Sequence, residues 1–185
     1  DCKKALMEAN GDFEAAIDNL RKKGAKVAAN RSDRDAKEAY IIAKTNSDQT
    51  QGYLVALNCE TDFVAKNADF IGFAEGVLNA AMNAGLKDLN EVNKLQYEGV
   101  TVADKLMDMI GKIGEKLEIS RYEVINAPRV IVYNHPGNRL ASMVGLNKAD
   151  VAGIDEIGKN VAMQIAAMNP VAVDKDDVDS KILER

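Results

Sequence analysis

Apolar positions recur at helical spacing in the first part of the chain. Residues 2–9 predict a short helix that ends at an Asn-Gly pair, which is typical of helix C-termini. Asp12 can cap a second helix over residues 13–23, and Gly24 is expected to end it. Two helices this short bury little surface alone. We therefore interpret residues 1–24 as part of a larger helical module.

Residues 25–37 lack this spacing and predict a basic linker. One hypothesis is an arm that binds nucleic acid. The alternative is a solvated connector whose first charges complement the end of the preceding helix. No aromatic residue is interleaved to stack on a base, which favours the connector. The basic positions in and just before the linker are Arg21, Lys22, Lys23, Lys26, Arg31, Arg34 and Lys37.

From residue 38 onward the apolar period changes to two, which is typical of β-strands. Residues 39–44 and 53–59 predict two strands that are joined by a polar hairpin loop. Three more strands are expected at residues 117–127, 129–134 and 140–146. Helical spacing returns between and after these strands, at about residues 67–84, 90–97, 101–113, 154–168 and 175–185.

Two stretches of the chain resemble each other. The segment from Tyr53 to Asn58 precedes a helix that ends in Ala-Ala-Met-Asn, and the segment from Met143 to Asn147 precedes a helix with the same ending. This repeat predicts an α+β fold with two related subdomains of antiparallel strands, each with helices packed on one side. We place the first subdomain at residues 38–127 and the second, which is incomplete, at residues 128–185.

The connection between strand and helix is longer in the first copy, where it contains Thr61, Asp62, Phe63 and Val64. The shared architecture does not need these extra residues, and binding groups are often presented at such a junction. Three alternatives follow. Phe63 packs back into its own core, or the loop carries catalytic groups, or the loop inserts into a partner protein.

A catalytic loop lacks the companions that it would need. His135 is the only histidine, and we interpret it as a turn residue or as a polar contact at a partner surface. Residues 147–150 fit a short guanine-recognition pattern, but the sequence has no phosphate-binding P-loop. No pair of carboxylates stands out as an acid–base couple. We predict a binding protein that is not an enzyme and needs no cofactor or metal; a nucleotide-binding enzyme is a further hypothesis.

The composition is that of an ordinary globular protein. The 185 residues are 46% hydrophobic and 29% charged, with a net charge of -5 and a pI of about 5.0. This acidic balance argues against nucleic acid as the main partner. Two cysteines are too few for a disulfide framework and fit reduced thiols in a cytosolic protein. No apolar run approaches the length of a membrane span, so no membrane partner is expected.

Three stretches together resemble the bacterial elongation factor Ts family. The segment from Asp1 to Leu6, followed by Asn10-Gly11-Asp12 and a helix, is similar to the amino-terminal module of that family. The segment from Asn58 to Lys66 resembles the core signature, and the segment from Ala162 to Ala167 is similar to a later helix. The matches follow one another in the order of the family along nearly the whole chain.

The resemblance implies a guanine nucleotide exchange factor that promotes GDP release from elongation factor Tu during translation elongation. The segment that carries Phe63 would approach the magnesium site of the partner, with the Phe wedged between partner side chains. Loss of the magnesium and a shift of the phosphate loop would then weaken GDP binding. The family positions near the partner correspond here to Thr61, Asp62, Phe63, Val64, Ile113, Gly114 and His135.

The resemblance also implies that residues 1–24 form a partial ubiquitin-associated-like module that docks on the nucleotide domain of the partner. Elongation factor Tu would be bound in its GDP-bound and nucleotide-free forms, and the full-length protein could form a homodimer. A location in the cytoplasm follows. An alternative class of function is an adaptor that binds proteins or RNA through the helical module and the basic linker.

Overall fold

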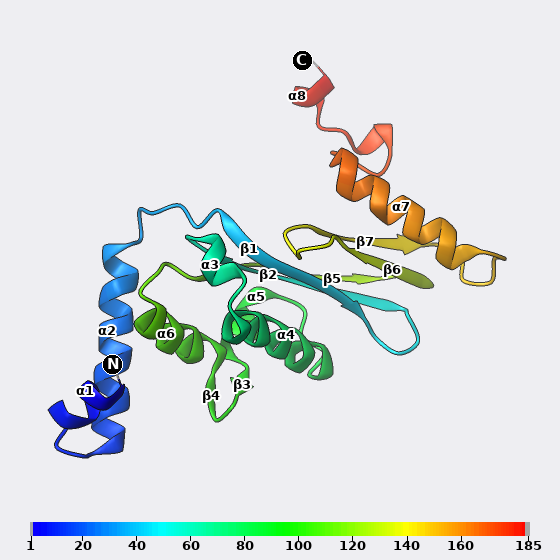
Figure 1. Ribbon diagram of the computed structural model, residues 1–185. Helices are drawn as coiled ribbons and strands as arrows, with labels where there is room; N and C mark the ends of the chain where they lie inside the picture. The colour runs from blue at the N-terminus through cyan, green and yellow to red at the C-terminus, as the bar shows by residue number, and fades with distance from the viewer. Residues whose placement is uncertain (1, 184–185) are drawn as a thin grey trace.

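The computed structural model describes residues 2–183 and has an α+β architecture, as the sequence predicts (Figure 1). Its central sheet is antiparallel, in the strand order β1-β2-β5, and a separate antiparallel pair is formed by β6 and β7. A two-residue pair, β3–β4, lies beside the helices. The strands are β1 (Glu38–Thr45), β2 (Gln51–Cys59), β3 (Gln96–Tyr97), β4 (Val100–Thr101), β5 (Glu118–Asn126), β6 (Arg129–Asn134) and β7 (Ala141–Leu146).

The helices surround the sheets in two groups. In Figure 1, α4, α5 and α6 lie on one side of the central sheet, whereas the β6–β7 pair and α7 lie on the other. The helices are α1 (Cys2–Glu8), α2 (Phe13–Asn30), α3 (Asp62–Ala65), α4 (Ala68–Asn83), α5 (Leu89–Lys94), α6 (Val102–Ile113), α7 (Ile154–Met168) and α8 (Ser180–Leu183), with one 3-10 turn at Lys175–Asp177.

Strand β2 forms the centre of the core because it is buried on both faces. Side chains alternate along a strand, so Tyr53, Val55 and Leu57 point to one face, where they pack with buried residues of α4. Phe70 and Val77 supply the facing apolar surface, and both are completely buried. Burying each such side chain contributes roughly 1.5–3 kcal/mol, so this face holds α4 firmly on the sheet.

The opposite face of β2 is covered by the β6–β7 pair. Gly52 points to this face, and a Cβ atom there would come within 2.7 Å of Val130 and 3.1 Å of Met143. Only a glycine allows the pair to approach so closely. Leu54 and Ala56, which share this face with Gly52, are also buried.

Two asparagines of the β6–β7 hairpin form hydrogen bonds with backbone amides and carbonyls of β1. The side chain of Asn134 accepts a hydrogen bond from the Ala43 amide at 2.8 Å and donates one to the Ala43 carbonyl at 3.0 Å. The Asn138 carbonyl accepts from the Ile41 amide at 2.6 Å, and its side chain donates to the Ile41 carbonyl at 3.2 Å. Edge strands left unpaired invite association. These contacts satisfy part of the outer edge of β1 instead.

Both copies of the predicted repeat contain an antiparallel strand pair followed by a helix. The first is β1–β2 with α4, and the second is β6–β7 with α7. Helix α7 packs closely on its strands, because a Cβ at Gly158 would lie 2.5 Å from Ile131. The buried Ser142 hydroxyl donates a hydrogen bond of 2.7 Å to the Ala162 carbonyl and fixes the helix in register. The central sheet gains a third strand, β5, beside β2.

The expected end of the second helix at Gly24 is wrong. Helix α2 continues to Asn30, so residues 25–30 of the expected linker are helical. The physical reason is a close crossing of α2 and α6. A Cβ at Gly24 would lie 2.3 Å from the Met107 carbonyl oxygen, and one at Gly111 would lie 3.0 Å from the Leu20 carbonyl oxygen. Gly24 therefore permits a backbone contact and does not terminate the helix.

Two other segments differ from the sequence prediction. The helix expected at residues 90–97 ends at Lys94, because Gln96–Tyr97 turns back to pair with Val100–Thr101. The helix expected at 175–185 is a 3-10 turn followed by the short α8 within the described residues. The sequence there is mostly polar, so it has no apolar face to pack a longer helix. Residues 184–185 lie outside the described part of the chain.

Substitution of Gly24 by Ala is expected to destabilise the protein by roughly 1–3 kcal/mol. Alanine is intrinsically the better helix former by about 1 kcal/mol, but the added methyl group would collide with a backbone carbonyl that cannot move aside. Chemical denaturation followed by circular dichroism measures the change.

Gly72→Ala is the matched control for this prediction. Gly72 lies inside α4 and is exposed, and a Cβ there has nothing within 4 Å. This variant should gain about 0.5–1 kcal/mol from helix propensity alone. Equal stabilisation by both substitutions would show that α2 and α6 do not cross closely.

Candidate functional site

The segment after β2 forms a short helix that is defined by its own caps. Thr61 is the N-cap of α3, and its hydroxyl oxygen accepts a hydrogen bond of 3.5 Å from the Val64 amide. Asn67 then caps α4, since its side chain accepts from the Asp69 amide at 2.9 Å and the Phe70 amide at 3.3 Å. Two helix starts therefore follow one another and hold the intervening residues on a rigid frame.

Phe63 is 83% exposed, whereas the residues after it face inward. Ala65 is buried, and Val64 is half-buried against the main apolar core. The contrast with Phe73, which is 4% exposed on α4, shows that this chain can bury a phenylalanine nearby. The alternative in which Phe63 packs into its own core is therefore wrong. A large aromatic held outward on a fixed helix is a typical anchor for a partner.

Asp62 lies beside Phe63 and carries a negative charge at ordinary pH. Its carboxylate accepts a hydrogen bond of 2.7 Å from the Lys66 ammonium, one helical turn later. This hydrogen bond lowers the pKa of Asp62 below its ordinary value, with a smaller contribution from the charge of Arg139. An exposed ion pair of this kind contributes little to stability, so the carboxylate can exchange Lys66 for another cation at low cost.

Glu115, which follows the end of α6, bonds to the residues at the start of α3. Its carboxylate accepts hydrogen bonds from the Thr61 hydroxyl at 2.7 Å, the Thr61 amide at 3.1 Å and the Glu60 amide at 3.2 Å. Gly114 makes this geometry available. It ends α6 in a left-handed conformation, with φ 79, and its amide donates to the Ile110 carbonyl at 2.8 Å. Glu115, which directly follows the predicted residues Ile113 and Gly114, thus joins the end of α6 to Thr61.

Glu60 bonds in turn to the residue that follows Glu115. Its carboxylate accepts a hydrogen bond of 2.7 Å from the Lys116 amide and two from the Arg31 guanidinium, at 2.7 and 2.8 Å. Burial of this side chain, which is 11% exposed, would raise its pKa. The Lys116 amide and the charge of Arg31 outweigh burial, so the pKa of Glu60 is lowered.

The contacts of Glu60 with Arg31 and of Glu115 with Thr61 were not predicted from the sequence. No local pattern identifies these residues, because their contacts join residues that lie 26 to 56 positions apart. A signal for both carboxylates is that Glu60 directly precedes the motif Thr61–Val64 and Glu115 directly follows Ile113–Gly114.

Residues of the basic linker also contact Glu60 and Lys116. Arg34 approaches the Glu60 carboxylate at 3.3 Å, and the Lys116 ammonium donates to the carbonyls of Ser32 and Arg34, at 2.8 and 3.1 Å. Lys37 pairs with Asp35 at 3.0 Å. Charges engaged in this way favour the connector over a nucleic-acid-binding arm.

His135 lies on the exposed turn between β6 and β7. One ring nitrogen, Nδ1, is 2.8 Å from the Tyr133 hydroxyl oxygen. Arg139 in the same turn pairs with Glu38 of β1 at 2.5 Å. Its positive charge also helps to lower the pKa of Asp62 at the start of α3. The His135 side chain is exposed, and its ring contact with Tyr133 is made within its own hairpin.

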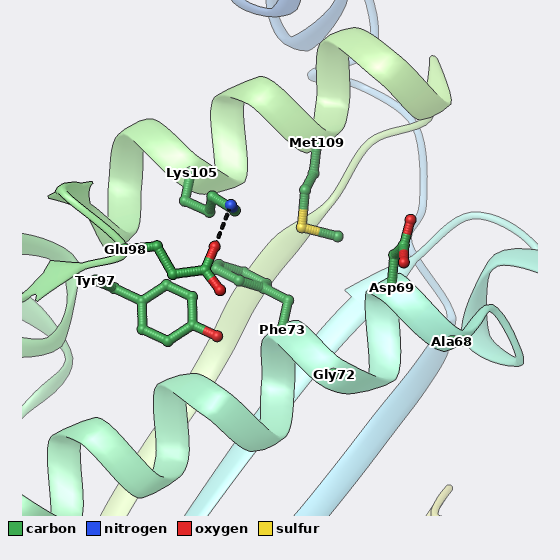
Figure 2. Close-up of a pocket in the computed structure, with 8 residues that line it drawn as sticks. All are labelled: Ala68, Asp69, Gly72, Phe73, Tyr97, Glu98, Lys105 and Met109. Atoms are coloured by element: carbon green, nitrogen blue, oxygen red, sulfur yellow. Dashed lines mark hydrogen bonds and ion pairs between the residues drawn. The ribbon is translucent and has the colours of Figure 1, made fainter.

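A half-open cavity of about 330 Å³ lies between α4, α6 and the β3–β4 pair (Figure 2). Phe73 and Tyr97 meet edge to face in its wall, with ring centroids 5.9 Å apart. Lys105 pairs with Glu98 across it, so the positive charge is already neutralised there. Asp69 adds a further carboxylate. This balance of charge does not suit a phosphate group.

The guanine-recognition pattern at residues 147–150 occupies the loop between β7 and α7. Asn147, Lys148 and Asp150 are exposed there. The first turn of α7 carries Asp155 and Glu156, which would repel a phosphate at this helix start. This arrangement gives no support to a nucleotide-binding enzyme.

Within residues 2–183, no group of three His, Cys, Asp or Glu side chains is arranged to hold a metal ion. Cys59 is buried, and burial raises the pKa of its thiol to about 12. A thiol of this kind is a poor nucleophile. None of the helices that the structure describes is both long and apolar enough to cross a membrane.

Comparison with known proteins gives consistent matches. Over residues 60–185 the chain matches the family model described as Elongation factor TS. Over its whole length it is 51% identical to the elongation factor Ts of Christiangramia forsetii and 48% identical to that of Flavobacterium psychrophilum, covering 66% of each. It is 44% identical to that of Amoebophilus asiaticus, of which it covers 67%. The chain spans about two thirds of the length of these curated relatives.

Substitution of Glu60 by Gln should lower stability at neutral pH by roughly 1–3 kcal/mol, because Arg31 then loses its charged partner. The folded state holds the pKa of Glu60 below the ordinary value of about 4.3. The carboxylate therefore adds stability above that value and loses it as the pH falls through the lowered pKa. The difference between wild type and Glu60→Gln should shrink below about pH 4, as measured by urea denaturation from pH 7 to pH 3.

Glu123→Gln serves as the control, since Glu123 is exposed on strand β5 and away from any helix terminus. Its stability should follow that of the wild type across the range. A Glu60→Gln difference that stays constant with pH would contradict a charged, paired Glu60.

Proposed function

Because the chain belongs to the elongation factor Ts family, we propose that it is a guanine nucleotide exchange factor that promotes GDP release from elongation factor Tu in the cytoplasm. The observation that carries this proposal is the exposure of Phe63 on a helix that is fixed at both ends. A side chain that is already outward and ordered loses little conformational entropy on binding. It can therefore act as an anchor without rearrangement of the free protein.

The proposed mechanism is the displacement of magnesium from the nucleotide site of the partner. Phe63 enters a pocket between partner side chains, and Asp62 follows beside it. A carboxylate placed next to a bound cation changes the electrostatics of that cation and its ligands. Lys66 shields the charge in the free protein and can be released at low cost. Thr61, Val64, Ile113 and Gly114 hold this surface, and His135 contacts the partner from the neighbouring turn.

No covalent step is required. Exchange factor and GDP each weaken the binding of the other to elongation factor Tu by the same factor, because the coupling between two sites is reciprocal. The protein binds both the GDP-bound and the nucleotide-free partner. Release accelerates because the ternary complex lowers the barrier to GDP dissociation. The protein is in this sense a binding protein and not an enzyme.

We further propose that α1 and α2 form part of a ubiquitin-associated-like module that docks on the nucleotide domain of the partner. The support is a set of outward apolar side chains on these two helices. Met7 is 69% exposed and Phe13 is 72% exposed. An adaptor that binds through the same helices and leaves the nucleotide untouched is the alternative, and the same assay separates the two.

Substitution of Phe63 by Ala should slow stimulated GDP release by roughly thirtyfold, because truncation of an anchor costs about 2 kcal/mol or more of binding. Stability should change by less than about 0.5 kcal/mol, since the ring is exposed. The measurement is the release of fluorescently labelled GDP from elongation factor Tu by stopped flow, with thermal unfolding measured in parallel.

Val173→Ala is the control, because Val173 is a fully exposed apolar residue far along the chain from the site. It should leave both exchange and stability unchanged. A wild-type chain that binds elongation factor Tu without accelerating GDP release would support the adaptor. An active wild type that is insensitive to Phe63→Ala would remove Phe63 from the mechanism.

A further inference from the structure

The segments 60–61 and 115–116 are joined by two carboxylates. Each segment supplies one carboxylate, which accepts hydrogen bonds from backbone amides of the other segment. Glu115 accepts from the amides of Glu60 and Thr61, and Glu60 accepts from the amide of Lys116. We name this arrangement, formed by Glu60 and Glu115, the carboxylate clamp. Hydrogen bonds in which one partner is ionised are roughly twice as strong as neutral ones. The two loops are therefore joined more firmly than ordinary neighbouring turns.

The clamp acts on Thr61, which in turn starts α3. The Thr61 hydroxyl donates to Glu115 at 2.7 Å and accepts from the Val64 amide at 3.5 Å, and the Thr61 carbonyl accepts from the Ala65 amide at 3.2 Å. A helix of four residues has no stability of its own. Its direction, and with it the direction of Phe63, depends on how Thr61 is held.

The cap alone does not explain this geometry. Thr61 needs only its own hydroxyl to cap α3, but that hydroxyl also donates to Glu115, and the Thr61 amide donates to the same carboxylate. Removal of Glu115 would leave two amides and one hydroxyl without an acceptor at a half-buried position. Such groups reorganise toward water, and the start of α3 would move with them.

We propose that Glu115 is a positioning residue for exchange: through the clamp it fixes Thr61 and α3 so that Phe63 is presented to the partner in one orientation. This inference rests on the proposed function for its effect on GDP release. Its effect on α3 is a property of the free protein and is measurable without a partner.

The first experiment is hydrogen–deuterium exchange of the free protein. In Glu115→Ala the amides of Ala65, Lys66 and Asn67, which bond within α3, should exchange roughly tenfold to hundredfold faster. The amides of Val55 and Leu57 in β2 should keep their protection. Unchanged protection in α3 would overturn the proposal, and so would an equal loss in α3 and β2, because that would be general destabilisation.

Two further variants keep this test decisive. Glu115→Gln retains the size of the side chain and one carbonyl acceptor, so it should show a smaller local increase and rescue most of the protection. It also replaces Glu115→Ala if that variant fails to fold. Glu123→Gln is the matched control, because Glu123 is an exposed residue of β5, and it should behave as wild type. A Glu115→Gln protein as labile in α3 as Glu115→Ala would contradict the role of the acceptor geometry.

The second experiment is a double-mutant cycle on GDP release from elongation factor Tu. If Glu115 acts through Phe63, Glu115→Ala should slow release severalfold in the wild-type background and add little to Phe63→Ala. Multiplicative effects would show that Glu115 acts independently and would overturn the positioning role. If the wild-type chain itself gives no acceleration, the proposed function fails, while the hydrogen-exchange result still decides whether the clamp fixes α3.

Discussion

Strand β2 is buried on both of its faces, and the other elements take their positions from it. Its apolar side chains hold α4 on one face, and the absence of a side chain at Gly52 lets the β6–β7 pair approach on the other. A strand enclosed in this way has almost no freedom to shift register, because a slip by one residue would exchange its two buried faces. The loop that leaves its end is therefore anchored at a fixed point.

This anchoring explains how a small protein surface can carry an exposed aromatic in a defined place. The Phe63 side chain does not pack in the core, so its position depends on the residues around it. Thr61 and Asn67 define the helix starts before and after it, Val64 and Ala65 pull its helix onto the core, and the carboxylate clamp joins it to the end of α6. Phe63 is thus exposed to solvent, whereas the residues next to it hold its helix in place.

Much of this could be predicted from the sequence, and the reasons for the rest are physical. The strands, the helix that begins after Asn67 and the repeated strand–helix unit follow from local spacing and side-chain chemistry, whereas the short helix α3 and its cap at Thr61 were not predicted. The direction of Phe63 does not follow from the sequence either, because a junction allows both burial and exposure. Gly24 is a helix terminator by local rules, and only its contact with Met107 shows otherwise. The clamp is invisible in the sequence because it joins residues that are distant along the chain.

The same distance has a consequence for the order of folding. The contacts of Glu60 with Arg31 and of Glu60 with Lys116 close loops of 29 and 56 residues. Closing loops of this size costs chain entropy before any contact offsets it, so we expect them to close after the hairpin β1–β2 and the helices have formed locally. The exposed Phe63 is therefore set in place among the last features of the molecule. A chain that has not yet packed α2 and α6 against each other lacks these contacts, so the helix that carries Phe63 is not yet held in its final position.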